Sequence, residues 1–482
     1  MMSQKGVTPR GEDYSRWYND LVQLADLADY APVRGCMVIK PYGYELWENI
    51  KNALDIRFKQ TGHKNAYFPL FIPMSFLQKE AEHVEGFAPE LAVVTHGGGK
   101  ELEEPLVVRP TSETVIGHSF SQWIQSHRDL PLLINQWANV VRWELRTRLF
   151  LRTTEFLWQE GHTAHATAEE AEAETMQMLD IYADFARNEA AIPVIKGRKS
   201  NQEKFAGAEA SYTIEGMMGN VWALQAGTSH YLGQNFAKAF DIKYRDENNE
   251  QEYCYTTSWG LSTRMIGAII MAHGDDTGLR LPPRLAPIQV VIVPIFKNEE
   301  QKGPVLEAAH RIAETLLTVN IRVHVDARDE KPGFKFNDWE MRGVPLRMEI
   351  GPRDVESGTV VLARRDRPGK EGKSTAKQDE IRAAVTRTLT EVQSGLLEQA
   401  TTFRDAHLHE ANSLEELKES IDTEGWALLP YDGSAEAEAK IKEETKASSR
   451  CFPLEGGDVE EGTKCAITGR PAVGKAYFAR AY

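Results

Sequence analysis

Two runs of alternating apolar and polar residues, separated by a short arginine-rich segment, occupy Asn135–His165. Such alternation predicts two β-strands joined by a loop at about residues 144–149. Side chains two positions apart share one face of a strand. We therefore expect Arg142 and Glu144 on one face of the first strand. The second strand is expected to carry a matching face formed by Arg152, Phe156, Trp158 and Glu160.

The composition of this hairpin face suits a nucleotide better than a protein core. Guanidinium groups match the geometry of phosphate oxygens, and an aromatic ring can stack on a base. The face therefore indicates a site for a triphosphate next to a purine. A solvated face with one salt bridge is the alternative, and the hairpin alone does not decide between the two.

Length and composition limit the class of protein. A chain of 482 residues is too long for one core, so two or three domains are expected. A hydrophobic content of 41% and a charged content of 26% are typical of globular proteins. No apolar run approaches the roughly 18 residues that cross a bilayer, and residues 1–17 lack the apolar core of a secretory signal. We expect a cytoplasmic protein with no membrane partner.

Cysteine usage and net charge limit the partners. The four cysteines, Cys36, Cys254, Cys451 and Cys465, include no Cys-x-x-Cys pair, which argues against a disulfide framework and fits a reducing compartment. The net charge of −15 argues against a protein that coats nucleic acid indiscriminately, and we expect no DNA partner. A local basic patch that docks one particular RNA is compatible with this charge.

A second candidate site follows the strand expected at Leu106–Arg109, in the segment Pro110–Glu113. Thr111 is a candidate N-cap for a helix that begins at Thr114. Alternatively, the Thr111 hydroxyl and the Glu113 carboxylate accept hydrogen bonds from a small cationic amine. The sequence permits both roles.

More polar residues gather in two later strands, expected over 204–216 and 220–233. In the second strand Gln225 shares a face with Ala223, whereas Thr228 and His230 follow a glycine that is expected to bulge the strand. His230 lies among small polar residues, and both a structural and a functional role stay open for it.

Residues 256–276 are predicted to run from a strand into a helix. Arg264 lies at the junction, and Ser262 precedes it on the turn. An arginine in this position is expected either to pair with an acidic residue or to contact a ligand anion.

The other periodic segments divide the chain. Helices at Tyr14–Ala25, Gly43–Lys59 and Ala168–Glu189, and a short apolar strand at Ala66–Pro73, precede a proline-rich linker at 279–287. Beyond it strands and helices alternate, which indicates a small α/β domain. Its strands are expected at Gln289–Ile295, Ile321–Asp326, Pro345–Glu349 and Thr359–Ala363, its helices at Val305–Leu317 and Phe334–Arg342, and a long helix at Lys377–His409 leads into a last region of helices and short strands.

Taken together, the segments PTSETVIG, RWE, RTTEFLWQEGHT, FAGA, LQAGTSHYLG and TTSWGLSTR closely resemble prolyl-tRNA synthetases of the compact type found in archaea, the eukaryotic cytosol and some bacteria. The resemblance runs from about Arg16 to Tyr482. It implies an α+β class II synthetase catalytic domain, an antiparallel sheet flanked by helices, at residues 1–284. It also implies an α/β anticodon-binding domain at 285–390 and a small α/β C-terminal domain at 391–482.

The resemblance implies an ATP-dependent, two-step attachment of L-proline to tRNA(Pro) through prolyl-adenylate, by a homodimer. Ala66–Pro73 resembles the family's motif 1 at the dimer interface, the hairpin resembles motif 2, and Gly260–His273 resembles motif 3. Implied ATP contacts are Arg142, Glu144, Arg152, Thr153, Phe156, Gln225, Thr228, Ser262 and Arg264, with Mg²⁺ carried by ATP near Gln225 and with Arg142 and Arg264 catalytic. Implied proline contacts are Thr111, Glu113, Arg142, Trp158, His162, Phe205 and His230.

Three further expectations rest on the same resemblance. Glu340, Arg347 and Arg353 are candidates for reading anticodon bases, because arginine can pair bidentately with guanine. Family members with a C-terminal zinc site use four cysteines, and the matching positions here are Asp432, Ala437, Cys465 and Thr468. A single thiolate does not make a tetrahedral zinc site, so we expect no zinc. Motifs 2 and 3 are joined without the large editing insertion of the other bacterial type, so no editing in cis is expected.

Two alternative functions are weighed against this one. A sister synthetase for threonine, histidine or glycine would share the fold and the anticodon domain, but the PTSE and WQEGH segments argue against it. A catalytically inactive paralogue would be expected to lose motif arginines, whereas Arg142, Arg152 and Arg264 are all present. The resemblance also suggests that the carboxylate of Tyr482 approaches the active site.

Overall fold

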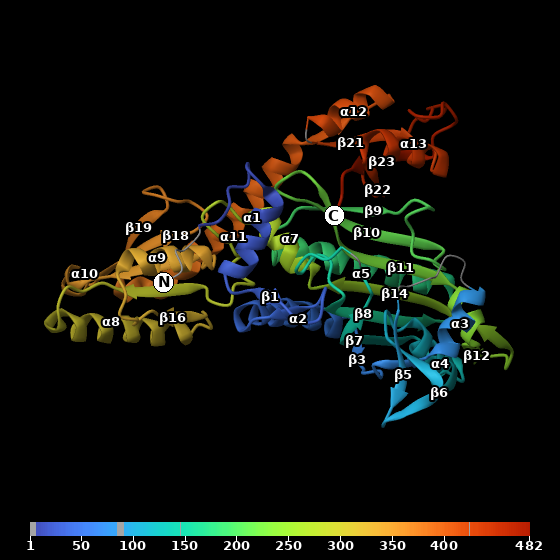
Figure 1. Cartoon of the computed structure of the whole chain (residues 1–482), viewed down its shortest axis with the longest axis horizontal. Helices are drawn as coiled ribbons and strands as arrows, with labels where there is room; N and C mark the ends of the chain where they lie inside the picture. The colour runs from blue at the N-terminus through green and yellow to red at the C-terminus, as the bar shows by residue number, and fades with distance from the viewer. Residues whose placement is uncertain (1–5, 84–90, 145, 424) are drawn as a thin grey trace.

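The computed structural model describes residues 6–83, 91–144, 146–423 and 425–482. Figure 1 shows an elongated molecule in which a small five-stranded sheet and its helices lie at one end, while a much larger sheet occupies the rest. Helix α11 (Ile381–Ala406) runs from the small-sheet end towards the last part of the chain, and it continues across residue 390. None of the helices within these ranges is both long enough and apolar enough to cross a membrane.

The large sheet has eleven strands in the order β20-β21-β23-β22-β9-β10-β11-β14-β8-β7-β3. Neighbouring strands in this sheet pair antiparallel, except for the parallel pairs β3–β7 and β20–β21. The strands that form its catalytic half are β3 (Lys64–Asn65), β7 (Leu132–Val141), β8 (Glu155–His165), β9 (Val194–Arg198), β10 (Ala210–Met217), β11 (Ala223–Gly233) and β14 (Tyr255–Ser262). A register shift opposite Ile214 and Glu215 gives β11 a bulge next to Gly227, as the sequence predicted.

Helices cover this sheet and supply its main core. Those around the largest apolar cluster are α1 (Tyr14–Leu24), α2 (Pro41–Gln60), α5 (Ala168–Asn188) and α7 (Arg264–His273). The predicted helical stripe on α2, Leu46, Ile50, Leu54 and Phe58, is buried throughout. The side chain of Thr167 caps α5, which packs on β11 and β14. A second cluster lies under α4 (Glu113–Trp123) and α6 (Asn235–Phe240), beside α3 (Met74–His83).

The strand predicted at Ala66–Pro73 is only partly correct. Lys64–Asn65 joins the large sheet as β3, and Phe71–Pro73 forms β4 in a separate sheet with β5 (Ala92–Gly97) and β6 (Lys100–Val108). Between them, the amide of Phe68 donates to the Gln136 side chain and its carbonyl accepts from the Arg109 guanidinium. Side chains thus satisfy backbone groups that a strand would have paired. Two-stranded ribbons complete this part: β1 (Ala28–Tyr30) with β2 (Met37–Ile39), and β12 (Lys243–Arg245) with β13 (Gln251–Tyr253).

The five-stranded sheet at the far end has the order β16-β15-β17-β18-β19. Its strands are β15 (Val290–Pro294), β16 (Val323–Val325), β17 (Leu346–Ile350), β18 (Thr359–Arg364) and β19 (Lys373–Lys377), and the helices are α8 (Glu299–Leu317), α9 (Pro332–Met341) and α10 (Pro352–Ser357). The predicted alternation of strand and helix is confirmed. However, the long helix begins at Ile381, because residues 373–377 extend the sheet as β19.

The predicted linker at 279–287 does connect the two ends of the molecule, but its apolar side chains are packed. Leu279, Leu281 and Leu285 are buried in the main core. The amides of Leu279 and Leu281 donate to the carbonyls of Met341 and Gly343. Close by, the guanidinium of Arg365 binds Asp275 with both terminal nitrogens, at 2.7 and 2.8 Å.

The last part of the chain extends the large sheet. It contains α12 (Leu414–Asp422), α13 (Ala435–Thr445) and the strands β20 (Leu408–Glu410), β21 (Trp426–Tyr431), β22 (Ser448–Pro453) and β23 (Gly474–Ala479). β22 pairs with β9 through Phe452 with Arg198 and Pro453 with Gly197. One hydrogen-bonded sheet therefore crosses from the catalytic half into the C-terminal strands (Figure 1).

Candidate active site

The hairpin predicted within Asn135–His165 is formed by β7 and β8, but the connection between these strands is longer than predicted. β7 ends at Val141 and β8 begins at Glu155, so Arg142, Glu144 and Arg152 lie in the connection rather than on strands. The predicted loop at 144–149 includes residue 145, which lies outside the described residues.

The connection leaves the sheet because its apolar residues belong to the core. Leu149, Phe150 and Leu151 are buried in the main cluster, and Phe150 has a positive φ of 62° that reverses the chain. The free energy gained by burying three large apolar side chains exceeds that of extending a two-stranded ribbon into solvent, which is marginally stable. Arg142 and Arg152 flank this buried turn.

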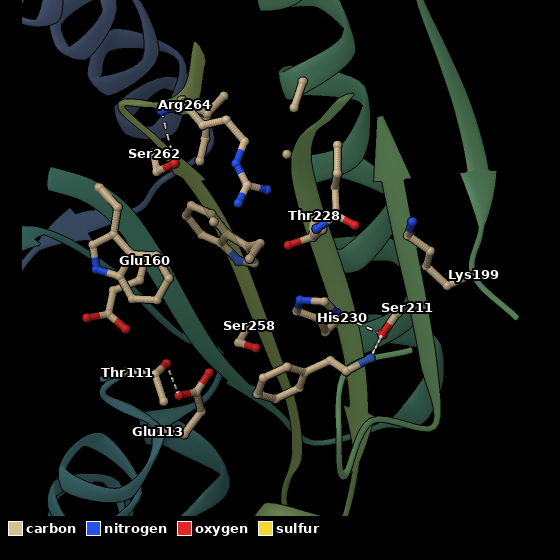
Figure 2. Close-up of a pocket in the computed structure, with 18 of the residues that line it drawn as sticks. Thr111, Glu113, Glu160, Lys199, Ser211, Thr228, His230, Ser258, Ser262 and Arg264 are labelled. Carbon is tan, nitrogen blue, oxygen red and sulfur yellow. Dashed lines mark hydrogen bonds between the residues drawn. The ribbon is translucent and has the colours of Figure 1, made fainter. Parts of the chain in front are cut away.

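A cavity of about 290 Å³ opens on the face of the sheet between β8, β11 and β14 and the start of α4. Figure 2 shows Arg264 and Ser262 at one end, Thr111 and Glu113 at the other, and His230 with Ser211 on the opposite wall. Many of the predicted site residues line it: Thr111, Glu113, Arg142, Phe156, Trp158, His162, Phe205, Gln225, Thr228, His230, Ser262 and Arg264. Glu160, which the strand pattern placed on the ligand face of the hairpin, also lines it, whereas sequence reasoning missed Lys199, Glu203, Ser211 and Ser258.

Arg142 lies between the two ends of the cavity and is held on three sides. Its Nε donates to the carbonyl of Pro110 at 3.0 Å. Its guanidinium lies 5.6 Å from the ring centre of Phe156 and 5.4 Å from that of Trp158. Burial lowers the pKa of Arg142, an effect that nearby Glu113 and Glu160 oppose. The result is a desolvated cation with a fixed orientation.

Thr111 and Glu113 form the acidic end of the cavity. Ser112, not Thr111, is the residue that precedes the first turn of α4, so the N-cap prediction for Thr111 is wrong. The Thr111 hydroxyl instead donates to the Glu113 carboxylate. Both side chains are nearly buried, and both line the cavity, which suits them to accept hydrogen bonds from a bound cation.

Glu160 anchors this end from below. Its two oxygens accept hydrogen bonds from the Ser112 backbone at 3.2 Å, the Ser112 hydroxyl, Gln136 at 2.9 Å and His162 at 2.9 Å. Burial raises the pKa of Glu160, but His162, Ser112 and Gln136 outweigh burial and bring it below its usual value. Burial likewise lowers the pKa of His162, and Glu160 reverses that shift. Each of the two groups therefore favours the charged form of the other across a contact of 2.9 Å. Glu160 lies two positions after Trp158, and this spacing is what placed both side chains on one face of the second strand in the sequence.

His230 is held as a neutral imidazole. Its Nδ1 lies 2.8 Å from the Ser211 hydroxyl, and its ring stacks on Phe205 at 4.8 Å between centres. Burial lowers its pKa to about 3, and the nearby charges of Lys199 and His162 add to that shift. His230 and Phe205 thus form a wall of the cavity that carries no charge at neutral pH.

The opposite end of the cavity is cationic. Arg264 begins α7, its Nε donates to the carbonyl of Leu151 at 3.1 Å, and its amide donates to the Ser262 hydroxyl at 3.2 Å. Burial lowers the pKa of Arg264 to about 10, and the nearby guanidiniums of Arg152 and Arg142 add to the shift. Several cations placed together without a matching number of carboxylates suit a polyanion such as a triphosphate.

Three predicted ATP contacts do not line the cavity itself. Glu144 and Arg152 lie in the connection between β7 and β8, with their charged atoms 3.8 Å apart. Thr153 is buried and donates to the carbonyl of Glu155. These positions follow from the rerouted connection, since neither Arg152 nor Thr153 belongs to β8.

Of the predicted anticodon residues, Arg347 lies on β17 of the five-stranded sheet, whereas Glu340 lies on α9 and Arg353 on α10. Arg347 donates to Glu340 at 2.6 Å and lies 3.9 Å above the ring of Phe336. Glu340 and Arg347 line a second cavity of about 180 Å³. Arg353 is on α10 and is not among the described residues that line it.

The four positions that match zinc ligands in the family are arranged in two pairs. Asp432 accepts hydrogen bonds from Thr468 at 2.7 Å and from the Arg470 guanidinium at 2.9 Å. Ala437 and Cys465 are buried together in the apolar cluster under β21 and β23. Within the described ranges, no group of three or more His, Cys, Asp or Glu side chains could hold a metal ion.

Comparisons with known proteins agree with this geometry. Residues 94–273 match the tRNA synthetase class II core domain (G, H, P, S and T), residues 289–388 match the anticodon binding domain, and residues 414–482 match the C-terminal domain of prolyl-tRNA synthetase. The antiparallel sheet flanked by helices, with a cavity that is acidic at one end and cationic at the other, is thus that of a class II aminoacyl-tRNA synthetase.

The curated relatives define the amino acid. The chain is 58% identical over 487 residues to the chloroplastic/mitochondrial proline–tRNA ligase of Arabidopsis thaliana, covering 100% of the chain and 89% of that protein. It is 57% identical over 484 residues to the proline–tRNA ligase of Roseiflexus sp. (strain RS-1), covering 100% of both. The chain belongs to the prolyl-tRNA synthetase family, and it attaches L-proline to tRNA in an ATP-dependent reaction. A sister synthetase for another amino acid is thereby excluded.

Proposed function

We propose that the cavity activates proline with Arg142 at its centre. The carboxylate of proline attacks the α-phosphorus of ATP, prolyl-adenylate forms, and pyrophosphate leaves. Arg142 contacts both the attacking carboxylate and the α-phosphate. The observation that carries this role is its position, since the guanidinium is clamped by Pro110, Phe156 and Trp158 between the acidic and cationic ends. A preoriented, desolvated cation stabilises developing charge without reorganisation.

The acidic end binds the proline ring and its secondary ammonium. Glu113 and Thr111 accept hydrogen bonds from the ammonium. The aromatic and imidazole groups of Trp158, His162, Phe205 and His230 enclose the ring. The neutral state of His230 supports this arrangement, because His230 then adds no positive charge that would repel the ammonium.

The cationic end binds ATP. Arg152 and Arg264 contact the β- and γ-phosphates, Phe156 stacks on adenine, and Glu144 faces the adenosine. Gln225, Thr228 and Ser262 line this half, and Thr153 contributes from the connection that precedes β8. Mg²⁺ enters with ATP. The cavity suits such an ion, because Mg²⁺ keeps several waters and takes few protein ligands besides phosphate oxygens, and the Gln225 amide offers one oxygen. When bound, it neutralises charge on the phosphates.

The test is proline-dependent pyrophosphate exchange by the full chain. Arg142→Ala is expected to abolish exchange while circular dichroism stays that of the folded protein. Arg128→Ala removes an exposed arginine from the same region and serves as the control. Exchange near the wild-type rate in Arg142→Ala would overturn the role given to this residue.

The same proposal extends to tRNA. Glu340 and Arg347 bind an anticodon base in the cavity that they line, and Arg353 contributes from α10. The activated proline is then transferred to the tRNA 3′ end. The C-terminal part binds no zinc, because the Arg470 guanidinium is already paired with Asp432. Correction of mischarged tRNA, where it occurs, is left to a separate protein.

Assembly, division into domains and location complete the proposal. The enzyme acts as a homodimer in the cytoplasm, with domain boundaries near residues 284 and 390. Exposed apolar side chains next to the small sheet of β4–β6, Tyr67, Phe71, Val93 and Trp123, support a subunit interface there. The four cysteines are unpaired, which fits a reducing compartment. Light scattering after size-exclusion chromatography tests the dimer, and a monomer at micromolar concentration would refute it.

A further inference from the structure

A buried charge network joins the wall of the cavity to the C-terminal strands. Lys199, which lines the cavity next to β9, donates from Nζ to Glu215 Oε1 at 2.9 Å. The Lys199 side chain is 3% exposed and that of Glu215 is fully buried. The position of a desolvated ammonium depends strongly on its partner, because no water can replace the lost interaction.

The other oxygen of Glu215 is bound from a distant part of the sequence. Arg450 on β22 donates to Glu215 Oε2 from Nε at 3.1 Å and from Nη2 at 2.8 Å. Its third nitrogen, Nη1, donates to the Ser448 hydroxyl at 3.1 Å. Burial raises the pKa of Glu215, but Arg450 and Lys199 outweigh burial and bring it to about 2. Both carboxylate oxygens are therefore engaged by cations.

Lys199 and Arg450 share the single carboxylate of Glu215 in this network. The three side chains are almost completely buried, and the charge of Glu203 also acts on Arg450. Arg450 takes one oxygen, so Glu215 cannot turn both of its oxygens to Lys199. The Lys199 ammonium is thus held by one oxygen of Glu215 while Arg450 holds the other.

The backbone around the network is equally tight. β22 pairs with β9 at Gly197 and Arg198, immediately before Lys199. A Cβ on Gly197 would lie 2.4 Å from the Cys451 sulfur and 2.7 Å from the Phe452 carbonyl oxygen, so only glycine permits this approach. The Lys199 amide then donates to the Ser211 carbonyl at 2.8 Å.

Lys199 begins the segment 199–209, which joins β9 to β10 and brings two side chains to the cavity. These are Glu203 and Phe205, and Phe205 stacks on His230. The Phe205 amide donates to the Ser211 hydroxyl, which also contacts His230 (Figure 2). The start of the segment is fixed by Glu215 and its middle by Ser211.

We propose that Arg450 is a positioning residue for proline binding: through Glu215 it holds Lys199 and thereby the segment that carries Phe205 against the cavity. The C-terminal strands therefore contribute to the amino acid site without touching the substrate. This inference rests on the proposed function, because it takes Phe205 and His230 as the wall of the proline site.

The test compares Arg450→Gln with Arg470→Gln in proline-dependent pyrophosphate exchange. Arg470 is a half-exposed arginine of the same C-terminal part that pairs with Asp432 and Glu436 rather than with Glu215. Arg450→Gln is expected to raise the KM for proline about tenfold, in the range of coupling inside one hydrogen-bond network. The KM for ATP and kcat should change less than twofold, and Arg470→Gln should match the wild type. Lys199→Gln alone should raise the KM for proline, and adding Arg450→Gln should then change it little.

Each remaining outcome has one meaning. An unchanged KM for proline in folded Arg450→Gln overturns the inference. This holds also when kcat falls, because a lower kcat with an unchanged KM for proline indicates a purely structural role. If Arg450→Gln does not fold, Arg450→Lys retains the charge and is expected to show a smaller rise in the KM for proline; an unaltered KM in that variant overturns the inference. Failure of the proposed function is separately visible, because the wild type would then lack proline-dependent exchange.

Discussion

Replacement of Glu160 by glutamine tests how the acidic end of the cavity is built. The carboxylate accepts from two groups on each oxygen, Ser112 N–H and His162 on one, the Ser112 hydroxyl and Gln136 on the other. A glutamine amide accepts on one side only, so two donors on the other side face an NH₂ group. An unsatisfied buried donor costs about 1–3 kcal/mol, and a hydrogen bond to a charged group contributes about 1.5–3 kcal/mol. The expected loss of folding free energy is about 3 kcal/mol.

The functional consequence follows from the position of Ser112 between Thr111 and Glu113. Loss of its anchor shifts both of these side chains, so the KM for proline should rise while the KM for ATP stays near that of the wild type. Urea unfolding followed by tryptophan fluorescence measures the first effect, and pyrophosphate exchange measures the second. Glu155→Gln, the same change at the exposed start of β8, is the control and should cost less than about 0.5 kcal/mol. A Glu160→Gln variant that matches this control in both assays would refute the reasoning.

The remaining predictions concern the ligand ends and the domain contact. Glu113→Ala should raise the KM for proline at least tenfold, as expected when a charged hydrogen bond of about 1.5–3 kcal/mol is lost, with little effect on ATP; equal changes in both would contradict its role. Arg347→Ala should weaken the preference for the native anticodon in aminoacylation of anticodon-substituted tRNA, and an unchanged preference would remove it from the anticodon site. Burial raises the pKa of Asp275, but Arg365 outweighs burial and brings it to about 2. The ion pair therefore stabilises the fold above the carboxyl's ordinary pKa, and this stabilisation is lost as the pH falls from about 4 to about 2; Arg365→Met should flatten that part of the acid unfolding curve. Elemental analysis should find no stoichiometric zinc.

Much of this molecule was predictable because local pattern and tertiary packing agree. The apolar stripe of α2 and the strands β7 and β8 follow directly from periodicity. The segment around Phe150 shows where such agreement ends. Its alternating apolar and polar residues fit a strand, but its apolar side chains are buried in the main core instead of extending the β7–β8 hairpin. No local pattern contains the location of that core.

Hydrogen bonds between residues far apart in the sequence are the second feature that the sequence did not predict. The period-two pattern placed Glu160 on a ligand face, but its partners Ser112 and Gln136 lie on separate elements, so its anchoring role was not visible. The same holds for Arg450, which is separated from Glu215 by 235 positions. Resemblance to a family indicates ligand-facing positions, whereas the residues that hold those positions in place are apparent only from the tertiary structure.

The pairing of β22 with β9 has a consequence for truncation. A chain cut before α12 would leave β9 as an edge strand, with the backbone groups near Gly197 and Lys196 unpaired. A bare edge next to a glycine invites pairing with another chain. The shortened protein would therefore be prone to aggregate. The isolated C-terminal fragment would be prone to aggregate for the same reason, because β22 would lose its partner β9. Because they share one sheet, each part depends on the other to cover its edge strand, although their sequences match separate family models.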